Sequence, residues 1–371
     1  MASVLKTKPR EWSPRMWEGC DTATLLKLLA SQRFAIDPKL SYIPLACSLT
    51  AYINTALGWA QRGIYGRKID STTITHPPLF VLGHWRTGTT LLHELLILDE
   101  NHACPETHAC LLPHHALLSE RFFKRFLNFL MPGKRPMDNM ALGWERPQED
   151  EFALALLGLP SPYRDIAFPN RPSISKNALD LQGLPEKELA KWKHGFMAFI
   201  RMLTFRDSRR LILKSPTHTA RIPILLELFP KAKFINITRN PYVLFSSTVN
   251  LWTSMARKHG FQTPRNPDLI RNKVIREFRI IYERYLADRS LIPKGNLVEF
   301  RYESFVGNPV EQLASAYDQL GLPDWEHVRQ RIEAYVANQK NYETNKYELS
   351  NHDRIMIKDE WGDLIAKLGY G

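Results

Sequence analysis

The sequence predicts an α/β fold of three layers, in which helices cover both faces of a central parallel sheet. Short apolar runs alternate along the chain with segments of helical periodicity, which is the pattern of parallel strands joined by crossover helices. At one junction between such a run and such a helix, residues 83–90 have the glycine spacing of a P-loop. The length of 371 residues is sufficient for one large domain of this kind with helical insertions.

The strands of the sheet are expected where short apolar runs are bounded by proline, glycine or charged residues. The first run enters through Pro77 and Pro78 and ends at Gly83, as a short buried strand does. The expected strands are residues 76–83, 211–214, 233–239 and 296–304. The expected helices are residues 89–100, 115–131, 220–230, 242–258, 267–289 and 309–320. In a parallel sheet of this type, ligands bind at the carboxyl ends of the strands.

The first part of the chain differs from this pattern, because residues 1–75 are expected to form a helical N-terminal extension ahead of an α/β domain at residues 76–371. Within the extension, residues 40–60 contain no charged side chain over a length close to that of a membrane-spanning helix. Polar residues in this stretch and its internal Pro44 argue against a span. Three interpretations stay open: a spanning helix, a helix on a membrane surface, and a helix packed on the main domain. The basic flank that supports the second interpretation consists of Arg62, Arg67 and Lys68.

The charge of the chain limits its partners. Lys and Arg number 50 and Asp and Glu number 38, which gives a formal net charge of +12. Such a surplus favours anionic partners, among them nucleotides, sulfated or phosphorylated substrates, nucleic acids and anionic lipids. We expect no nucleic-acid partner, because several informative cations lie at expected strand ends rather than in a basic stripe.

Composition also limits the class of protein and its compartment. A hydrophobic content of 44% is ordinary for a globular protein, and a mean hydropathy of −0.31 excludes a polytopic membrane protein. Four cysteines are too few for a disulfide framework in a chain of this length. The basic start of the sequence has no apolar segment typical of a signal peptide. We therefore expect a cytoplasmic protein, with membrane contact through residues 40–68 left open.

The strongest functional signal is the run from Gly83 to Thr90, G-H-W-R-T-G-T-T, between an expected strand and an expected helix. Backbone N–H groups of such a loop, together with the N-terminus of the following helix, bind phosphate oxygens. Nucleoside-triphosphatases carry a Lys where this chain has Thr89, and the cation within the run is Arg86. Without that Lys, a P-loop kinase or NTPase is the less favoured alternative.

The loop sequence W-R-T-G-T-T-L-L resembles the 5′-phosphosulfate loop of sulfotransferases that use 3′-phosphoadenosine 5′-phosphosulfate (PAPS). The pattern in that family is P-[KR]-[ST]-G-T-T, so Trp85 stands in place of the usual Pro. A second block, I-T-R-N-P-Y-V-L-F-S-S, is similar to the family's 3′-phosphate motif, whose Arg and Ser correspond to Arg239 and Ser247. The resemblance is clearest over residues 78–100 and 208–305, and it is closer to the bacterial and tyrosylprotein-type branch than to the cytosolic aryl type.

This resemblance implies an enzyme that moves a sulfuryl group from PAPS to a hydroxyl or amine of an acceptor and releases 3′,5′-ADP, with no metal ion required. Fixed donors and cations stabilise the charge that develops in such an in-line displacement. Lys214 matches a Lys that related enzymes place beside the sulfuryl group, and Arg86 is expected to stabilise the leaving group. The expected PAPS-binding residues of the loop are Arg86, Thr87, Gly88, Thr89, Thr90 and Leu91.

The residue that takes the proton of the acceptor is left open among three named candidates, with another His as a further possibility. Glu106 resembles the catalytic Glu that tyrosylprotein-type sulfotransferases carry shortly after this loop and helix. His218 resembles the catalytic His of the cytosolic class, although it lies too far along the chain from Lys214 for a close match. The third candidate is an acidic cluster, which could equally be a solvated helix N-terminus. The members of this cluster are Glu145, Glu149, Asp150 and Glu151.

The sequence does not identify the acceptor. Residues 101–175 and 254–275 are expected to shape its site, and the 18 Phe and nine Trp of the whole chain favour a lipid, sterol, phenol or other amphiphile, with a polysaccharide left open. The candidate walls are Trp144, Phe152, Tyr163, Phe168, Trp252 and Phe261. A run of Cys and His at residues 102–115 fits no compact zinc pattern, so no metal site is expected there. A membrane-surface nucleotide-binding protein without catalytic activity is the remaining alternative.

Overall fold

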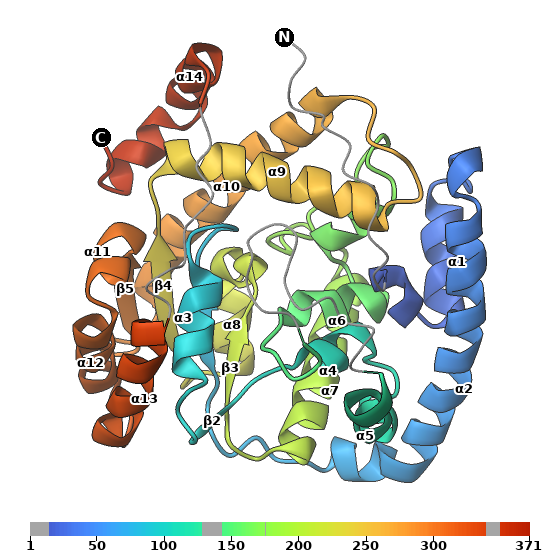
Figure 1. Ribbon diagram of the computed structural model, residues 1–371, viewed down its shortest axis with the longest axis horizontal. Coiled ribbons are helices and arrows are strands. Elements are labelled where there is room, and N and C mark those ends of the chain that lie inside the picture. The colour runs from blue at the N-terminus through green and yellow to red at the C-terminus, as the bar shows by residue number, and fades with distance from the viewer. Residues whose placement is uncertain (1–14, 128–142, 175, 339–348) are drawn as a thin grey trace.

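The computed structural model describes residues 15–127, 143–174, 176–338 and 349–371. A five-stranded sheet forms the centre of this part of the chain, with the strand order β2-β3-β1-β4-β5 and every neighbouring pair parallel (Figure 1). The strands are β1 (Leu79–Leu82), β2 (His102–Ala103), β3 (Arg210–Lys214), β4 (Lys233–Thr238) and β5 (Leu297–Arg301). The structure thus confirms the α/β class with a central parallel sheet.

Both faces of the sheet carry apolar side chains, and helices cover both faces. Along β1, Leu79 and Val81 face one layer, and Phe80 and Leu82 face the other, and all of them are fully buried. The helices over the first face are α3 (Thr89–Leu96), α12 (Pro309–Leu320) and α13 (Trp325–Asn338), and those over the second include α7 (Glu186–Arg206), α8 (Ile222–Leu228) and part of α10 (Pro267–Asp288).

The remaining helices surround this three-layer unit (Figure 1). They are α1 (Thr22–Ser31), α2 (Tyr42–Asp70), α4 (Thr107–Leu111), α5 (Ala116–Phe126), α6 (Asp150–Leu156), α9 (Pro241–His259), α11 (Tyr302–Gly307) and α14 (Asn351–Lys367). Short 3-10 helices are η1 (Met16–Gly19), η2 (Pro38–Leu40), η4 (Pro162–Ala167), η5 (Pro216–Ala220) and η6 (Arg289–Leu291). Because β3, β1 and β4 end at the same edge of the sheet, the segments that follow these strands meet there.

Most expected elements are present, and their boundaries differ where a side chain or a turn interrupts the pattern. α12 coincides with the expected helix at residues 309–320, whereas the strand expected at residues 296–304 ends earlier, because α11 begins at Tyr302. The helix expected at residues 220–230 is divided between η5 and α8. The break falls at Arg221, whose backbone is not helical and whose guanidinium group is turned into the protein interior.

Two further helices are shorter than their periodicity indicated, and one strand was not expected. α3 ends at Leu96, just before a turn in which the N–H of His102 donates to the carbonyl of Asp99 at 3.0 Å. α5 covers most of the helix expected at residues 115–131, of which residues 128–131 lie outside the described part of the chain. β2 at the edge of the sheet has two residues, too few to carry a recognisable strand pattern.

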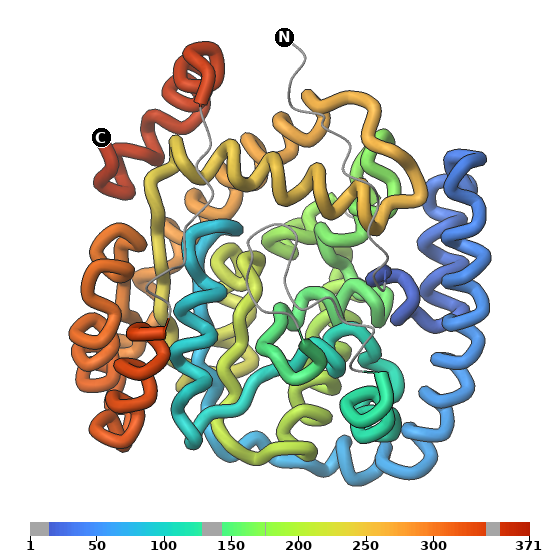
Figure 2. Tube along the Cα trace, viewed as in Figure 1, coloured from blue at the N-terminus to red at the C-terminus, as the bar shows by residue number. Residues whose placement is uncertain are grey.

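The N-terminal helices pack along one side of the α/β unit (Figure 2). Met16, Trp17, Ile43 and Cys47 belong to the same apolar core as residues of α9, α10 and α14. The indole N–H of Trp17 also donates to the carbonyl oxygen of His259 at 2.7 Å, which ties η1 to the end of α9.

The uncharged stretch at residues 40–60 forms most of α2, a helix of 29 residues. One side of α2 is buried through Ile43, Cys47 and Ala51, as the packed-helix interpretation expected, but the other side is exposed through Leu45 and Trp59. Among the residues that the structure describes, no helix combines the length and apolar character needed to cross a membrane.

Candidate functional site

The phosphate-loop candidate connects β1 to α3 and has an unusual backbone. Gly83, Arg86 and Gly88 have φ values of 143°, 73° and 98°, in the region that favours glycine. A Cβ atom at Gly88 would lie 2.4 Å from the ring of Tyr302, so the backbone passes this ring where a side chain cannot fit. Loops that contain residues with positive φ form concave sites for anions. Here the loop lies at the N-terminus of α3.

The other end of the expected nucleotide site is formed by Arg239 and Ser247, which the structure brings next to Arg86. The Nε–H of Arg86 donates to Oγ of Ser247 at 2.9 Å, and the guanidinium group of Arg239 donates to the carbonyl oxygen of Arg86 at 3.0 Å. Arg239 also lies over the ring of Tyr302, 4.1 Å from its centroid. The residues expected to bind the two phosphate groups of a nucleotide therefore lie together at the carboxyl ends of β1 and β4.

Helix α9 begins at this point in a way that suits an anion. The side chain of Asn240 caps the helix by accepting a hydrogen bond from the N–H of Tyr242 at 3.0 Å, and Pro241 occupies the first turn. Ser247 follows on the same helix and is almost fully buried. The positive end of the helix dipole thus lies beside the guanidinium group of Arg239.

A second group of polar side chains gathers at the end of β3, around Lys214 and Glu149. The ammonium group of Lys214, whose side chain is 1% exposed, donates to Oε1 of Glu149 at 2.7 Å. The hydroxyl of Tyr163 donates to the other oxygen of Glu149, and the indole N–H of Trp85 donates to that hydroxyl at 2.9 Å. A chain of hydrogen bonds therefore leads from Trp85 in the phosphate loop to the carboxylate of Glu149.

Tyr163 is held in its protonated form within this chain. Burial and the adjacent carboxylate of Glu149 both raise the pKa of Tyr163 well above its ordinary value. The phenol is therefore a permanent hydrogen-bond donor to Glu149 at neutral pH. It fixes one carboxylate oxygen, while Lys214 holds the other.

The two acidic residues after Glu149 bind the segment that follows Lys214. Asp150 and His218 are both fully buried, with 2.8 Å between Oδ2 and Nε2, and the hydroxyl of Ser215 donates to Oδ1 of Asp150 at 2.9 Å. Burial by itself raises the pKa of Asp150, but His218 and Ser215 more than offset this effect, so the pKa lies below its ordinary value. Asp150 and His218 therefore act on each other rather than on solvent.

Glu151 completes this set of contacts by forming a buried ion pair with Arg221. The two distances between guanidinium nitrogens and carboxylate oxygens are 2.7 and 3.2 Å, and Thr217 donates a hydroxyl hydrogen bond to Glu151 at 2.8 Å. Arg221 also donates to backbone carbonyls, and it stacks on the ring of Trp192. Consecutive acids at the start of α6 are in this way bound to the segment between β3 and α8, which fixes the position of Glu149.

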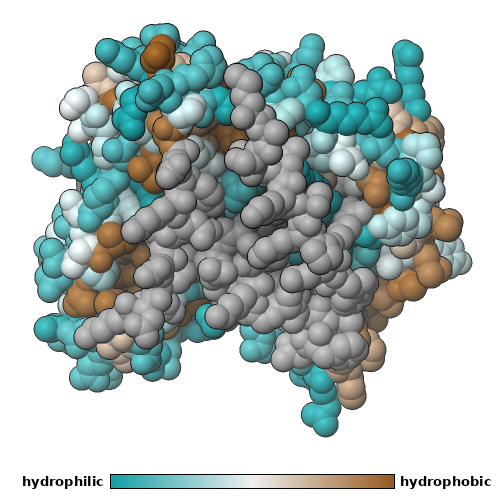
Figure 3. Space-filling view, turned by 45° about the horizontal axis from the view of Figure 1, so that its top comes forward, coloured by the Kyte–Doolittle hydropathy of each residue, from teal (hydrophilic) through white to brown (hydrophobic). Residues whose placement is uncertain are grey.

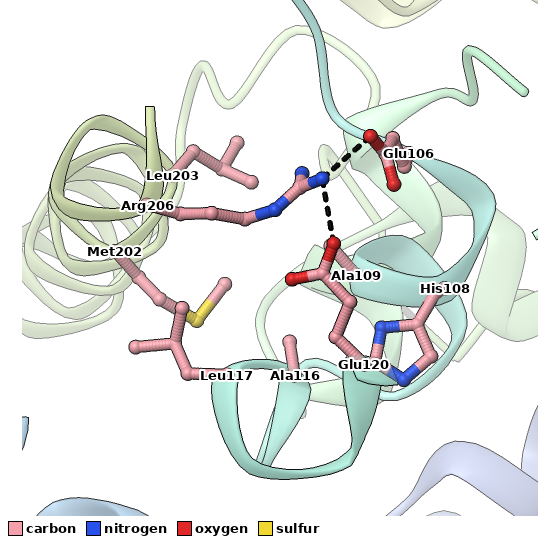
Figure 4. A pocket seen from close by; sticks show the side chains of 9 residues that line it. All are labelled: Glu106, His108, Ala109, Ala116, Leu117, Glu120, Met202, Leu203 and Arg206. Atoms are coloured by element: carbon pink, nitrogen blue, oxygen red, sulfur yellow. Dashed lines mark hydrogen bonds and ion pairs between the residues drawn. The ribbon is translucent and has the colours of Figure 1, made fainter. Parts of the chain in front are cut away.

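The three candidates for the proton acceptor occupy different places. Glu106 forms ion pairs with Arg206 at 2.5 Å and Lys124 at 2.8 Å, and it lines a small pocket between α4, α5 and α7 (Figure 4). Among the contacts of the described residues, none joins Glu106 to Lys214 or to the phosphate loop. His218 is completely enclosed and bound to Asp150.

Glu106 nevertheless contributes to the site through its backbone. It pairs with Pro147 in an isolated antiparallel bridge, and the N–H of Thr107 donates to the carbonyl oxygen of Arg146 at 2.9 Å. These bonds hold the segment that leads into α6. Of the acidic cluster, Glu145 is largely exposed near Lys124, whereas Glu149 contacts both Lys214 and the chain from the phosphate loop.

The expected aromatic walls divide into separate groups. Phe152 and Trp252 contact the ring of Tyr163, with centroid separations of 5.0 and 5.6 Å, and Trp85 lies 5.1 Å from Trp252. Within this group, Tyr163 binds Glu149 and Trp85 belongs to the loop. The walls that lie elsewhere are Phe168 and Phe261, which pack on each other, and Trp144, which packs on Phe123.

The run of Cys and His at residues 102–115 serves packing and hydrogen bonding. Nε2 of His108 and Nδ1 of His115 both lie within 3.0 Å of the hydroxyl of Ser119, and Nε2 of His115 lies 3.0 Å from Oδ1 of Asn54. Within the described residues, no group of His, Cys, Asp and Glu has the arrangement of a metal site. The cysteines of the run are buried free thiols.

Two residues of the site were missed by the sequence analysis. Thr219 binds the start of the phosphate loop, since its hydroxyl accepts a hydrogen bond from the N–H of Gly83 at 2.7 Å. Tyr302 supplies the ring that lies against both Gly88 and Arg239. Neither belongs to a recognisable motif, because each reaches the loop from a distant part of the chain. The hydrogen bond of Tyr163 to Glu149 has no signal in the sequence either.

Comparisons with known proteins point to one family. A family model described as the sulfotransferase family matches residues 77–327. The chain is 41% identical over 361 residues to the omega-hydroxy-beta-dihydromenaquinone-9 sulfotransferase Stf3 of Mycobacterium bovis and of Mycobacterium tuberculosis, and the alignment covers 97% of this chain and 92% of each relative.

Solved structures of two bacterial sulfotransferases share the fold. The sulfotransferase STF9 of Mycobacterium avium superposes with a TM-score of 0.65 at 18% identity, over 95% of this chain and 97% of that one. The sulfotransferase STF1 of Mycobacterium tuberculosis H37Rv superposes with a TM-score of 0.61 at 18% identity, over 92% of this chain and 90% of that one.

Proposed function

The chain belongs to the sulfotransferase family and transfers a sulfuryl group to an acceptor, and we propose that PAPS is the donor and the hydroxyl group of a lipid is the acceptor. The observation that carries this proposal is the contact between Lys214 and Glu149 at the end of β3, joined to the phosphate loop through Tyr163 and Trp85. It combines a buried cation with a fixed carboxylate beside a loop suited to phosphate.

The residues of the nucleotide site fit PAPS. Arg239 and Ser247 suit the 3′-phosphate, because a guanidinium group, a hydroxyl and a helix N-terminus converge there. We assign the 5′-phosphate to the loop from Thr87 to Leu91, at the start of α3. Arg86 lies between these two positions and is proposed to contact the donor from the loop side. When bound, PAPS supplies an activated sulfuryl group and leaves as 3′,5′-ADP.

The contacts of Glu149 favour it as the proton acceptor. Its carboxylate is fixed by Lys214 and Tyr163, and it is partly exposed, with 14% of its side chain accessible. We propose that Glu149 receives the proton that the acceptor hydroxyl loses. Lys214 then neutralises negative charge that develops next to it, as a fixed cation in a site with little water does. His218 and Asp150 are proposed to position the carboxylate of Glu149 by holding the start of α6, and not to contact the substrate.

A lipid acceptor is supported by the relatives and by the aromatic residues near Glu149. The relatives that are 41% identical are named as sulfotransferases of a hydroxylated menaquinone derivative. In this chain, the rings of Phe152 and Trp252 pack on the ring of Tyr163, whose hydroxyl binds the carboxylate. We propose that residues 101–175 and 254–275 shape the acceptor site around these rings.

We also propose a domain division and a cellular location for the chain. The division into an extension at residues 1–75 and a catalytic domain at residues 76–371 is compatible with a family match that begins at residue 77. A cytoplasmic location agrees with the unpaired state of the four cysteines.

Transfer of 35S from labelled PAPS to defined acceptors tests the function. We expect label to enter a quinone whose isoprenoid chain ends in a hydroxyl, and not the same quinone without that hydroxyl. Label that enters neither the lipid nor any other hydroxylated amphiphile would contradict the proposal. A thermal-shift comparison addresses the kinase or NTPase alternative: 3′,5′-ADP should stabilise the protein, and ATP with Mg2+ should do so much less.

A further inference from the structure

The outward side of α2 is an exposed apolar surface that the catalytic site does not use. Leu45, Leu49, Tyr52 and Trp59 are 74%, 68%, 72% and 75% exposed. Their spacing of three, four and seven residues places them in one row along the helix. Apolar residues gather along the right-hand edge of Figure 3, where Figure 1 places α1 and α2. A row of exposed apolar side chains of this kind is typical of an interaction site.

The opposite side of α2 fixes the direction in which this row points. The amide group of Asn54 donates to the carbonyl oxygens of Glu18 and Cys20 at 2.7 and 2.8 Å. The amide group of Gln61 donates to the carbonyl oxygen of His114 at 3.1 Å and accepts from the N–H of Leu117 at 2.8 Å. These buried polar contacts prevent the helix from rotating to bury its apolar row.

Positive charges stand at both ends of the row. Arg67 continues the same line of residues beyond Trp59, Lys39 precedes the helix, and Arg62 and Lys68 follow Trp59 on other sides of the helix, all of them exposed. Asp70 is the exposed acid at this end of the helix, and its salt bridge to Arg62 at 2.9 Å offsets both charges, so Arg67, Lys68 and Lys39 supply the net positive charge. The adjacent helix α1 adds the exposed side chains of Leu26 and Lys27. The surface therefore has an uncharged centre with a basic rim.

We propose that this face of α2 docks on the surface of an anionic lipid bilayer, with the helix axis parallel to the membrane plane. An amphipathic helix binds in this way when its apolar row enters the interfacial region and its cations meet acidic headgroups. Tyr52 and Trp59 have the amphipathic rings that favour this depth. The inference is independent of the acceptor, since it concerns a surface outside the catalytic site.

A second copy of the chain is a less suitable occupant. If two α2 helices paired in parallel, Arg67 and Lys68 would meet their own equivalents. If they paired in antiparallel fashion, the same residues would approach Lys39. Both arrangements bring like charges together, whereas an anionic bilayer complements the basic rim.

Co-sedimentation of the full chain with vesicles tests the proposal, without PAPS or acceptor present. We expect binding to vesicles that contain phosphatidylglycerol, and weaker binding to pure phosphatidylcholine. The double variant Leu49→Ser/Trp59→Ser should lower the partition coefficient for anionic vesicles at least about tenfold. The double variant Arg67→Gln/Lys68→Gln should remove most of the preference for anionic lipid.

Ile355→Ser on α14 is the matched control, because Ile355 is an exposed apolar residue (62%) on another helix. It should leave vesicle binding unchanged. All the substituted side chains are exposed, so each variant should keep the thermal shift that 3′,5′-ADP produces in the unaltered protein. That readout separates a failure of docking from a failure of the nucleotide site.

Two results would overturn the inference. One is vesicle binding by Leu49→Ser/Trp59→Ser that equals that of the unaltered protein. The other is an absence of vesicle binding together with a dimer, observed by sedimentation velocity, that the same double variant converts to monomer. The second result would assign the surface to another copy of the chain.

Discussion

Lys214 and Glu149 form an ion pair of 2.7 Å across 65 positions of the sequence, with the ammonium group almost completely enclosed. The pair is possible because β3 delivers Lys214 to the end of the sheet, while Asp150 and Glu151 hold the start of α6 against the segment that follows β3. The proposed chemistry depends on this relationship.

Replacing Glu149 by Gln should lower kcat by a factor on the order of 10²–10⁴, because the amide cannot accept the proton of the acceptor. The KM for PAPS should change little, since the nucleotide is assigned to other residues. Initial rates with 35S-labelled PAPS measure both constants. Glu106→Gln is the comparison, and its kcat should stay within a few-fold of the unaltered enzyme. A large loss for Glu106→Gln with none for Glu149→Gln would reverse the assignment.

Replacing Arg239 by Ala should raise the KM for PAPS by about ten- to a hundred-fold, because a charge-assisted contact to a phosphate is lost. Ser247→Ala should have a smaller effect in the same direction. Both variants should reduce the thermal shift produced by 3′,5′-ADP. Arg329→Ala provides a matched control, since Arg329 is paired with Glu333 on the surface. The assignment fails if 3′,5′-ADP stabilises Arg239→Ala as much as the unaltered protein.

The hydrogen bonds between Trp85, Tyr163 and Glu149 predict coupled effects. Tyr163→Phe and Trp85→Phe should each lower kcat several-fold, because one bond in the chain that orients Glu149 is lost. The double variant should lose less than the product of the two single losses, since both act through the same hydroxyl. Rates from the four proteins of this cycle measure the coupling. Strictly multiplicative losses would show that the two side chains act separately.

The buried pair between Glu151 and Arg221 predicts a large loss of stability. Arg221→Met should reduce the free energy of unfolding by about 3–5 kcal/mol, because it leaves the carboxylate of Glu151 buried without its partner. Urea denaturation measures the change. Removing both charges with Glu151→Gln/Arg221→Met should cost less than Arg221→Met alone. If the double variant is the less stable of the two, the charge of Glu151 is not the source of the loss.

The buried imidazole of His115 predicts a dependence of stability on pH. Desolvation lowers the pKa of His115 to about 4, so the folded chain keeps it neutral at pH 5, where the unfolded chain binds a proton. The unfolded state then binds more protons, and stability must fall as the pH is lowered from 7 to 5. His115→Gln should reduce this fall by about 1–2 kcal/mol, measured by urea denaturation at both pH values. An unchanged difference between the two pH values would contradict the assignment.

The main strands of the sheet and the candidate nucleotide site could be read from local sequence. β1, β3 and β4 are short apolar runs. The loop after β1 is recognisable by the spacing of Gly83 and Gly88 and by the threonines that follow. Arg239 and Ser247 lie on one strand end and the helix after it, so their spacing along the chain reports their position. Such motifs can be recognised in a sequence because residues close together along the chain set their geometry.

The candidate for the proton acceptor could not be chosen in that way. Glu106, His218 and Glu149 all lie in chemically suitable sequences, and the contacts that distinguish them join distant segments. The pairing of Glu106 with Arg206 and the enclosure of His218 by Asp150 are results of packing. The same limit applied to α2, whose uncharged stretch before Arg62 could not show that one side is buried and the other exposed.

The sequence by itself determined the fold class and the glycine spacing of the loop after β1, and it singled out the residues that we propose for the nucleotide, because each of these depends on neighbours along the chain. The tertiary structure decided which acid stands beside Lys214, that Tyr163 links it to Trp85, and which row of α2 faces outward. These features depend on where separate elements pack, and local patterning does not encode the distance between side chains that the fold brings together.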